Sequence, residues 1–172
     1  MPNLENDTSI QIIINASPET LYNHLIDFRN HVAWNHQLVE ITQATPGPIQ
    51  VGTVFEALER APASVPNWLE PILMGLLRLL GSVPQSRAEI TRLVPNEQIE
   101  WTAQAPIDGQ SDMQMKWQLT FTSQGEATQI SQQFQMFPHS FMARVMTTPK
   151  MKRQIAAGCK ENLAKLKSLI EK

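Results

Sequence analysis

The sequence lacks the patterns that mark secretion, membrane insertion and disulfide bonding. Cys159 is the only cysteine, so no disulfide can form within the chain, and this favours a reducing compartment. No apolar run reaches the roughly 20 residues that a helix needs to cross a bilayer. The first residues also lack the basic start and apolar core of a secretory signal. We therefore expect a cytoplasmic protein.

Motifs for catalysis and for cofactor binding are missing as well. The sequence contains no HExxH, CxxC or GxSxG motif and no glycine-rich phosphate loop. It therefore gives no support for zinc hydrolysis, thiol redox chemistry, a nucleophile-elbow esterase or nucleotide binding. The histidines show no recognised metal-binding spacing; they are His24, His31, His36 and His139. We predict that the protein uses no metal and no cofactor.

Charged residues are few and unevenly placed. They make up 17% of the chain, with a net charge of −2, yet eight of the fourteen basic residues lie between Arg144 and Lys172. This basic stretch has no interleaved exposed aromatics, so we predict that the protein does not bind nucleic acid. A solvated helix face is the simpler interpretation of the stretch, and an anionic partner is the alternative.

Apolar residues are abundant enough to build a core. With 172 residues, 42% of them hydrophobic, the chain is expected to form a single domain over residues 1–172. Alternating patterns predict about seven strands, mostly antiparallel, beginning with 9–15. Turn-forming residues separate the later strands at Pro46-Gly47-Pro48, Pro95-Asn96, Asp108-Gly109 and Gln124-Gly125.

Two positions carry clear start signals for helices. Ser17 and Thr148 can each cap a helix, and each is followed by a proline, which suits the first helical position. The first helix is expected to run to about Asp27, with another turn or two over 29–33. The second is a long amphipathic helix that reaches the C-terminus. A separate or kinked helical turn is expected over 140–147.

Three strands between Gln98 and Phe137 carry large, soft apolar side chains on one face. Methionine is unbranched and polarizable, so it adapts to irregular partners. We interpret this face as one wall of a ligand cavity, and plain core is the alternative. The three rows are Ile99, Trp101, Ala103 and Ala105, then Met113, Met115, Trp117, Leu119 and Phe121, then Ile130, Phe134 and Met136.

An apolar helical insertion is predicted over residues 61–84. Within 72–80 only Gly75 and Arg78 are not large and apolar, and a helix that is apolar nearly all round cannot stay exposed. It is too short to span a membrane. Four roles remain open: extra core, a lid over the cavity, a homodimer contact through 68–80, or a peripheral membrane contact through the same segment.

A strand, two short helices, a run of antiparallel strands and a long closing helix follow one another from about Ser9 to the C-terminus. The segments that carry this order are IIINASPETLYNHLIDFRNHVAWN, VGTVF, ITRLVPNEQIEW and WQLTF. The arrangement resembles the helix-grip fold of the START/plant-allergen-like (SRPBCC) superfamily, in particular its polyketide cyclase/dehydrase and lipid-transport branch. The resemblance implies an α+β fold, with a curved sheet around the final helix and a hydrophobic cavity between them.

Members of this superfamily bind lipids, hormones, polyketides and aromatic compounds, and some are enzymes, so the fold alone does not define the function. Our leading hypothesis is binding or transport of a hydrophobic small molecule or lipid, gated by 62–84 and 141–146. On the family geometry the ligand-binding candidates are Trp101, Met113, Met115, Trp117, Phe134, Met136, Phe141, Met142 and Met146.

Two further hypotheses stay open. A polyketide cyclase or dehydratase-like enzyme would need an acid or base within hydrogen-bond reach of its substrate, and the candidates are Glu56, His139 and Arg144. Each of these has a structural alternative, with Glu56 on an outer strand face, His139 in a surface turn and Arg144 in solvent. The third hypothesis is a docking module that uses the apolar insertion to contact a membrane or a protein.

Overall fold

A seven-stranded antiparallel sheet forms the body of the protein. The computed structural model describes residues 8–60, 72, 85–104 and 113–172. The strands lie in the order β1-β7-β6-β5-β4-β3-β2, and the predicted antiparallel pairing is confirmed. Their bounds are β1 Thr8–Ile14, β2 Leu38–Gln43, β3 Val54–Glu59, β4 Gln85–Val94, β5 Gln98–Gln104, β6 Met113–Gln124 and β7 Ala127–Pro138.

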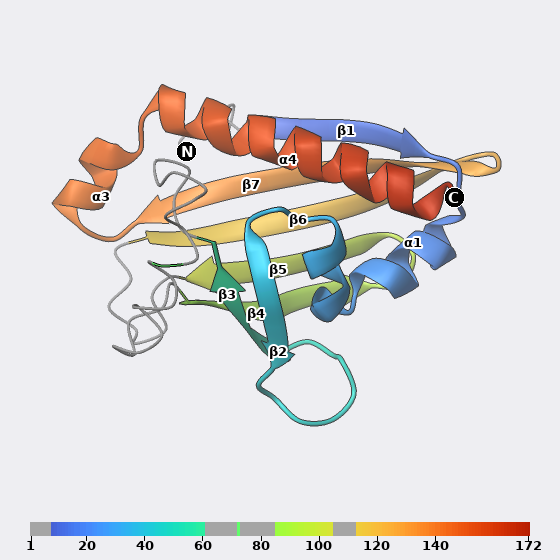
Figure 1. The fold of residues 1–172 in the computed structure, drawn as a ribbon, viewed down its shortest axis with the longest axis horizontal. Coiled ribbons are helices and arrows are strands. Elements are labelled where there is room, and N and C mark those ends of the chain that lie inside the picture. The colour runs from blue at the N-terminus through green and yellow to red at the C-terminus, as the bar shows by residue number, and fades with distance from the viewer. Residues whose placement is uncertain (1–7, 61–71, 73–84, 105–112) are drawn as a thin grey trace.

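The helices pack mainly on one face of this sheet. They are α1 Pro18–Leu25, the 3-10 helix η1 Phe28–Ala33, α3 Phe141–Met146 and α4 Pro149–Ile170. Figure 1 shows α4 alongside β1, with α1 near the C-terminal end of α4 and α3 beyond the end of β7. Buried residues from α1, η1, α4 and the inner face of the sheet form one core cluster. The α+β architecture expected from the sequence is therefore confirmed.

Both predicted helix starts are confirmed. Ser17 Oγ accepts a hydrogen bond from the Thr20 N–H at 3.1 Å, and Thr148 Oγ1 accepts one from the Met151 N–H at 3.1 Å. Each cap satisfies one of the backbone donors that a helix leaves unpaired at its N-terminus. Because the caps lie directly after β1 and before the last helix, they set where α1 and α4 begin relative to the sheet.

The C-terminal end of α4 is tied to the end of β1. Lys167 Nζ donates to the Ile13 carbonyl oxygen and to Glu171 Oε1, each at 2.7 Å. The same Glu171 oxygen accepts a hydrogen bond from the Asn15 N–H at 2.7 Å. The hydrogen bond from Lys167 is the main reason why the pKa of Glu171 is lowered. These contacts fix the C-terminal end of α4 beside β1, which is an edge strand of the sheet.

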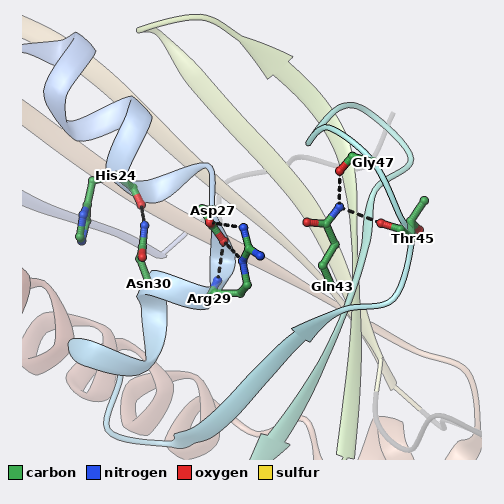
Figure 2. A network of polar contacts seen from close by, with 7 residues as sticks. All are labelled: His24, Asp27, Arg29, Asn30, Gln43, Thr45 and Gly47. Carbon is green, nitrogen blue, oxygen red and sulfur yellow. Dashed lines mark hydrogen bonds and ion pairs between the residues drawn. The ribbon is translucent and has the colours of Figure 1, made fainter.

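Polar contacts join α1 to η1 (Figure 2). Asn30 Nδ2 donates to the His24 carbonyl oxygen at 2.9 Å, across the chain reversal between the two helices. Asp27 Oδ1 caps η1 by accepting a hydrogen bond from the Arg29 N–H at 3.0 Å. The Arg29 guanidinium donates to both oxygens of the same carboxylate, from Nε to Oδ1 at 2.8 Å and from Nη2 to Oδ2 at 2.6 Å. The hydrogen bond from the Arg29 side chain is the main cause of the lowered pKa of Asp27. This short helix is therefore held in a defined orientation.

The loop after β2 is held by hydrogen bonds from the side chain of Gln43, the last residue of that strand (Figure 2). Gln43 Nε2 donates to the Thr45 carbonyl oxygen at 2.7 Å and to the Gly47 carbonyl oxygen at 2.9 Å. Gly47 has a φ of +103°, a conformation that only glycine adopts without strain. The hairpin predicted at Pro46-Gly47-Pro48 is confirmed by the pairing of β2 with β3.

The strand register aligns inner-face side chains into rows that cross the sheet. One row joins Ile90, Trp101, Trp117 and Phe134, and the next joins Ile99, Leu119, Gln132 and Ile10. Most members of both rows are buried. The alternation predicted for β5, β6 and β7 is therefore confirmed, with Ile99, Trp101, Leu119, Phe121, Ile130 and Phe134 all in the core.

Several sequence predictions concern segments outside the described residues. The apolar insertion 61–84, including its contact segment 68–80, lies outside them except for the exposed Ile72. Ala105 and the turn at Asp108-Gly109 also lie outside them. Within the described part of the chain, no helix is long and apolar enough to cross a membrane.

Candidate functional site

A cavity of about 190 Å³ lies between the inner face of the sheet and α4, with η1 along one side. Its walls come from segments that are far apart in the sequence, because β2 to β7 all contribute inward-facing residues. The described residues that line it are Phe28, His31, Trp34, Asn35, Gln37, Leu38, Ile41, Phe55, Ala57, Glu59, Ser86, Ala88, Trp101, Ala103, Met115, Trp117, Gln132, Ile155, Gly158, Cys159 and Asn162.

Aromatic rings form a connected surface around this cavity. Phe28 stacks on Phe55 with ring centroids 4.8 Å apart and meets Trp101 edge-on at 5.1 Å. Trp101 in turn stacks on Trp117 at 6.1 Å, and Trp117 contacts Phe134 at 5.4 Å. Such contacts stabilise the rings in fixed orientations. The lining therefore offers flat apolar surfaces that suit an aromatic or other rigid hydrophobic ligand.

The side chain of His31 enters the lining from η1 in its neutral form. His31 Nε2 lies 2.9 Å from the Leu25 carbonyl oxygen, which can only accept, so this nitrogen carries the ring proton. Burial lowers the pKa of His31 to about 4, outweighing the hydrogen bond to Leu25, which acts in the opposite direction. At neutral pH the ring is therefore uncharged, and its Nδ1 can only accept.

Asn162 joins α4 to the segment between η1 and β2. Its Oδ1 accepts from the His36 ring Nδ1 at 2.6 Å and from the His36 N–H at 3.2 Å. Its Nδ2 donates to Asn35 Oδ1 at 3.1 Å. Asn162 is 7% exposed, so these hydrogen bonds replace those that its amide would make with water. They hold α4 next to the segment that follows η1, at one side of the cavity.

Cys159 also lines the cavity from α4, so the protonation state of its thiol decides whether it could act as a nucleophile. The side chain is buried, and burial raises the pKa of this thiol to about 11. The reactive form of cysteine is the thiolate, which this environment disfavours. Cys159 is therefore an apolar wall residue here and not an activated nucleophile.

Two polar atoms at this site have no hydrogen-bond partner. Trp34 Nε1 and Gln132 Oε1 are both buried and unpaired among the described residues, and both side chains line the cavity. His24 Nε2 is also buried and unpaired, but His24 is not among the described lining residues. Buried polar groups are nearly always paired with protein or water. Among the described lining residues, Trp34 therefore has a buried donor, and Gln132 a buried acceptor, that no protein group satisfies.

The charges at the cavity are few. Among the described lining residues there is no lysine or arginine, and Glu59 supplies the one carboxylate. Since His31 is neutral at neutral pH, these residues provide no positive charge to pair with an anionic ligand. Within the described part of the chain no group of three histidine, cysteine, aspartate or glutamate side chains is placed to hold a metal ion.

The ligand-binding candidates on the sheet divide into two groups. Trp101, Met115 and Trp117 line the cavity. Phe134 and Met136 are not among its described lining; Phe134 is buried behind Trp117, and Met136 packs against the core. Met113 is half-buried at the start of β6, paired with Pro138. Most of the described strand lining therefore comes from β2 to β6, and β7 contributes Gln132.

The candidates on α3 lie elsewhere. Phe141 is 78% exposed, and the side chain does not line the cavity. The side chains of Met142 and Met146 are outside the part of the structure that is described. The roles proposed for these three residues and for a gate over 141–146 stay predictions.

The three candidate catalytic residues are not brought together. Glu56 is half-buried and lies between Phe55 and Ala57, which both line the cavity, so strand alternation directs Glu56 to the opposite face. His139 and Arg144 are both exposed, before and within α3. None of the three is among the described lining residues.

Sequence reasoning missed several residues that line the cavity, including Phe28, Trp34, Gln132 and Asn162. Gln132 had a detectable signal, because period-two alternation places it on the same face as Ile130 and Phe134. Phe28, His31 and Trp34 had no such signal. They lie in or beside a 3-10 helix of six residues, which is too short to display a clear apolar stripe.

The antiparallel sheet and the long C-terminal helix that packs on it define a helix-grip fold. A family model described as polyketide cyclase/dehydrase and lipid transport matches residues 7–171. The chain therefore belongs to this family, within the START/plant-allergen-like (SRPBCC) superfamily that the sequence resembles. No curated protein matches the chain.

Solved structures show the same fold at low sequence identity. Protein CV1439 from Chromobacterium violaceum is 18% identical, with a TM-score of 0.66 over 100% of this chain and 99% of that chain. A START superfamily protein from Mycobacterium smegmatis is 14% identical, with a TM-score of 0.64 over 96% and 97%. Ara h 8.0201 is 9% identical, with a TM-score of 0.65 over 96% and 97%. The predicted helix-grip fold is confirmed.

Proposed function

We propose that this protein binds a small hydrophobic molecule in the cavity between the sheet and α4. The observation that carries the proposal is the lining, in which rings from η1, β3, β5 and β6 surround one space of about 190 Å³. Apolar burial would drive binding, at about 25 cal/mol per Å² of surface removed from water. The few polar lining groups would orient the ligand.

The volume favours a compact ligand. Sites for drug-sized molecules measure roughly 300–1,000 Å³, whereas an apolar cavity of roughly 150 Å³ holds benzene. A cavity of about 190 Å³ therefore suits a compound with one or two rings better than a long-chain lipid.

The lining supports binding more than acid–base catalysis, although the family description includes cyclases and dehydrases. A general acid or base must reach the reacting group of the substrate. The ring proton of His31 is held by the Leu25 carbonyl oxygen, and burial keeps the Cys159 thiol protonated by raising its pKa to about 11. Glu59 is the lining carboxylate to substitute first if any turnover is found.

The first test is native mass spectrometry of the purified protein, followed by denaturing extraction of any bound compound. A stoichiometric aromatic or other hydrophobic molecule would support the proposal. A protein that is empty, and that also binds none of a panel of one- and two-ring compounds, would contradict it.

A cavity-blocking substitution provides a sharper test. Gly158 lines the cavity from the middle of α4, and among the described residues a Cβ at this position would meet only His36 Cε1, at 3.9 Å. Gly158→Leu should fold, since leucine favours helix more than glycine does, but its side chain would occupy ligand space. We expect calorimetric affinity for a two-ring compound to fall at least tenfold.

The matched control for this substitution is Ala157→Leu. Ala157 is the preceding residue of the same helix and is exposed, so the added side chain points into solvent. This variant should bind like the wild type. Equal binding by wild type, Gly158→Leu and Ala157→Leu would place the ligand outside the cavity.

A further inference from the structure

We propose that the protein docks on an anionic lipid membrane through α3 and the start of α4. None of the residues concerned is among the described lining of the cavity, so the inference does not depend on what the cavity binds. We call this surface the docking patch. It consists of the exposed apolar residues Phe137, Phe141 and Val145 and the exposed basic residues Arg144, Lys150 and Arg153.

The orientation of α3 is the first observation. Among its described side chains Ala143 is the buried one, whereas Phe141 is 78% exposed and Val145 is 58% exposed. Ser140 Oγ accepts from the Ala143 N–H at 3.1 Å, and Thr147 Oγ1 donates to the Ala143 carbonyl oxygen at 2.8 Å. A surface helix normally turns its large apolar residues toward the core. The reverse arrangement makes physical sense if another apolar phase covers Phe141 and Val145.

Exposed apolar residues concentrate at this end of the fold. In the described part of the chain seven large hydrophobic residues are exposed, and three of them fall within 137–145. Phe141 and Val145 are four positions apart on α3 and therefore share one side of it. Phe137 lies just before the end of β7, which leads into α3. Clustered exposure of this kind marks an interaction surface, whereas isolated exposed residues do not.

The charge around these residues has one sign. Residues 127–160 contain five basic residues and no aspartate or glutamate. Arg144, Lys150 and Arg153 are exposed, and none of them forms an ion pair with a described residue. Their charges are therefore available to an external anionic surface.

The basic residues at the start of α4 are unfavourable for the helix itself. A helix N-terminus carries partial positive charge, so cations there are destabilising. Lys150 and Lys152 nevertheless lie in the first turn of α4, which contains no acidic residue. An anionic surface at this end would be attracted both by these side chains and by the helix terminus.

The apolar and basic parts of the docking patch lie at the same end of the molecule. Only residues 147 and 148 separate α3 from α4, and Figure 1 shows α3 and the N-terminal end of α4 together at the left. Attraction between charges extends over about 8 Å at physiological ionic strength. The basic side chains can therefore act on the same membrane without touching the same lipid.

A lipid surface fits the docking patch better than a second copy of the chain. A symmetric contact between two copies would place the same basic patch on both sides of the interface, where like charges repel. At a membrane, phenylalanine and valine side chains enter the acyl boundary while lysine and arginine stay at anionic head groups.

Vesicle flotation with the full chain tests the inference. The probes are vesicles of phosphatidylcholine alone and vesicles in which about a third of the lipid is phosphatidylglycerol, which supplies the anionic surface. The wild type should bind the anionic vesicles at least about tenfold more tightly, and added salt should reduce this difference.

Charge substitutions assign the binding to the docking patch. Lys150→Gln combined with Arg153→Gln should weaken binding to anionic vesicles by about tenfold to thirtyfold, at roughly fivefold for each basic residue. The matched control combines Lys165→Gln with Lys172→Gln. Both residues are exposed at the opposite end of α4, and their loss changes the net charge equally. This control should bind within about twofold of the wild type.

Valine substitutions test the apolar part with an equally matched pair. Val145 is 58% exposed, and Val51, in the connection between β2 and β3, is 56% exposed. Val145→Gln should weaken vesicle binding by about threefold, and Phe141→Gln by at least about tenfold, because each removes apolar surface that enters the membrane. Val51→Gln should bind like the wild type. Since all three positions are exposed, the variants should keep the wild-type melting temperature.

The outcomes separate this inference from the proposed function. Failure of the wild type to bind anionic vesicles would overturn membrane docking and leave the cavity proposal intact. Equal weakening by the two charge variants would mean that net charge, and not the docking patch, attracts the protein. A dimer of the wild type that Phe141→Gln dissociates would assign the patch to a second copy and overturn the inference.

Discussion

At the scale of single residues, His31 couples the stability of the fold to pH. Burial lowers its pKa to about 4, from 6.5 for an exposed imidazole. Between these two values the unfolded chain binds a proton that the folded protein excludes, so stability falls as pH decreases through this window. Well above pH 6.5 both states are neutral at this position, and the contribution no longer changes.

We therefore predict that the free energy of unfolding falls by about 3 kcal/mol from pH 6.5 to pH 4 because of His31 alone, at about 1.4 kcal/mol per pKa unit. The measurement is urea denaturation at half-unit pH steps. In His31→Gln this part of the pH dependence should disappear, whatever the absolute stability of the variant.

His139→Gln is the matched control for this prediction, because His139 is exposed. This variant should keep the wild-type slope between pH 4 and 6.5. An unchanged slope in His31→Gln would mean that the buried imidazole is not the group responsible.

At the scale of elements, the position of α4 depends on polar contacts as well as on apolar packing. Its C-terminal end is tied to β1 through Lys167, whereas its middle is tied to the η1–β2 segment through Asn162. The first contact is made with the edge strand β1, and the second with the segment that follows η1. Together they keep α4 in place where the core beneath it is interrupted by open space.

Asn162→Ala should remove the middle contact and destabilise the protein by about 2 kcal/mol. The expected loss combines three hydrogen bonds, each of about 0.5–1.5 kcal/mol, with a partial gain from the better helix propensity of alanine. Urea denaturation gives the loss in stability. Relative to the wild type, amide hydrogen exchange in this variant should accelerate more in the middle of α4 than at its C-terminal end.

Glu161→Ala is the control, since Glu161 precedes Asn162 on the exposed side of the helix. Its stability should remain within about 0.5 kcal/mol of the wild type, as for most surface substitutions. If Asn162→Ala behaves in the same way, the contacts to His36 and Asn35 do not hold α4.

At the scale of the whole molecule, a ligand in the cavity should stabilise the fold. The cavity is built from η1, α4 and most strands of the sheet, so an intact site exists only in the folded state. With 2-naphthol as a two-ring probe, at 100 times its dissociation constant, linkage predicts about 2.7 kcal/mol of added stability. For a chain of this size the melting temperature should rise by about 5–10 °C.

Thermal denaturation monitored by circular dichroism across a series of 2-naphthol concentrations tests this prediction. The wild type should show a concentration-dependent rise in melting temperature, and Gly158→Leu should show little or none. An equal rise in both proteins would indicate binding at a site other than the cavity.

Much of this architecture was predictable because it depends on local patterns. Period-two alternation identified the inner face of β5, β6 and β7, and the Ser17 and Thr148 signals located the starts of α1 and α4. The cavity lining was predictable only in part. Trp101, Met115 and Trp117 border the cavity, whereas Phe134 on the same face does not, because sheet curvature and the path of α4 decide which inward residues face open space.

By itself the sequence determined the order of the elements, the inward faces of the central strands and the absence of any intramolecular disulfide, since each follows from residue type and spacing along the chain. The tertiary structure alone decided that His31 and Trp34 line the same cavity as Gln132, since the first two lie in and directly after η1 and Gln132 lies in β7, about a hundred residues away. Local periodicity holds no information about which distant side chains will share a space. That depends on strand register, on the curvature of the sheet and on where α4 is anchored.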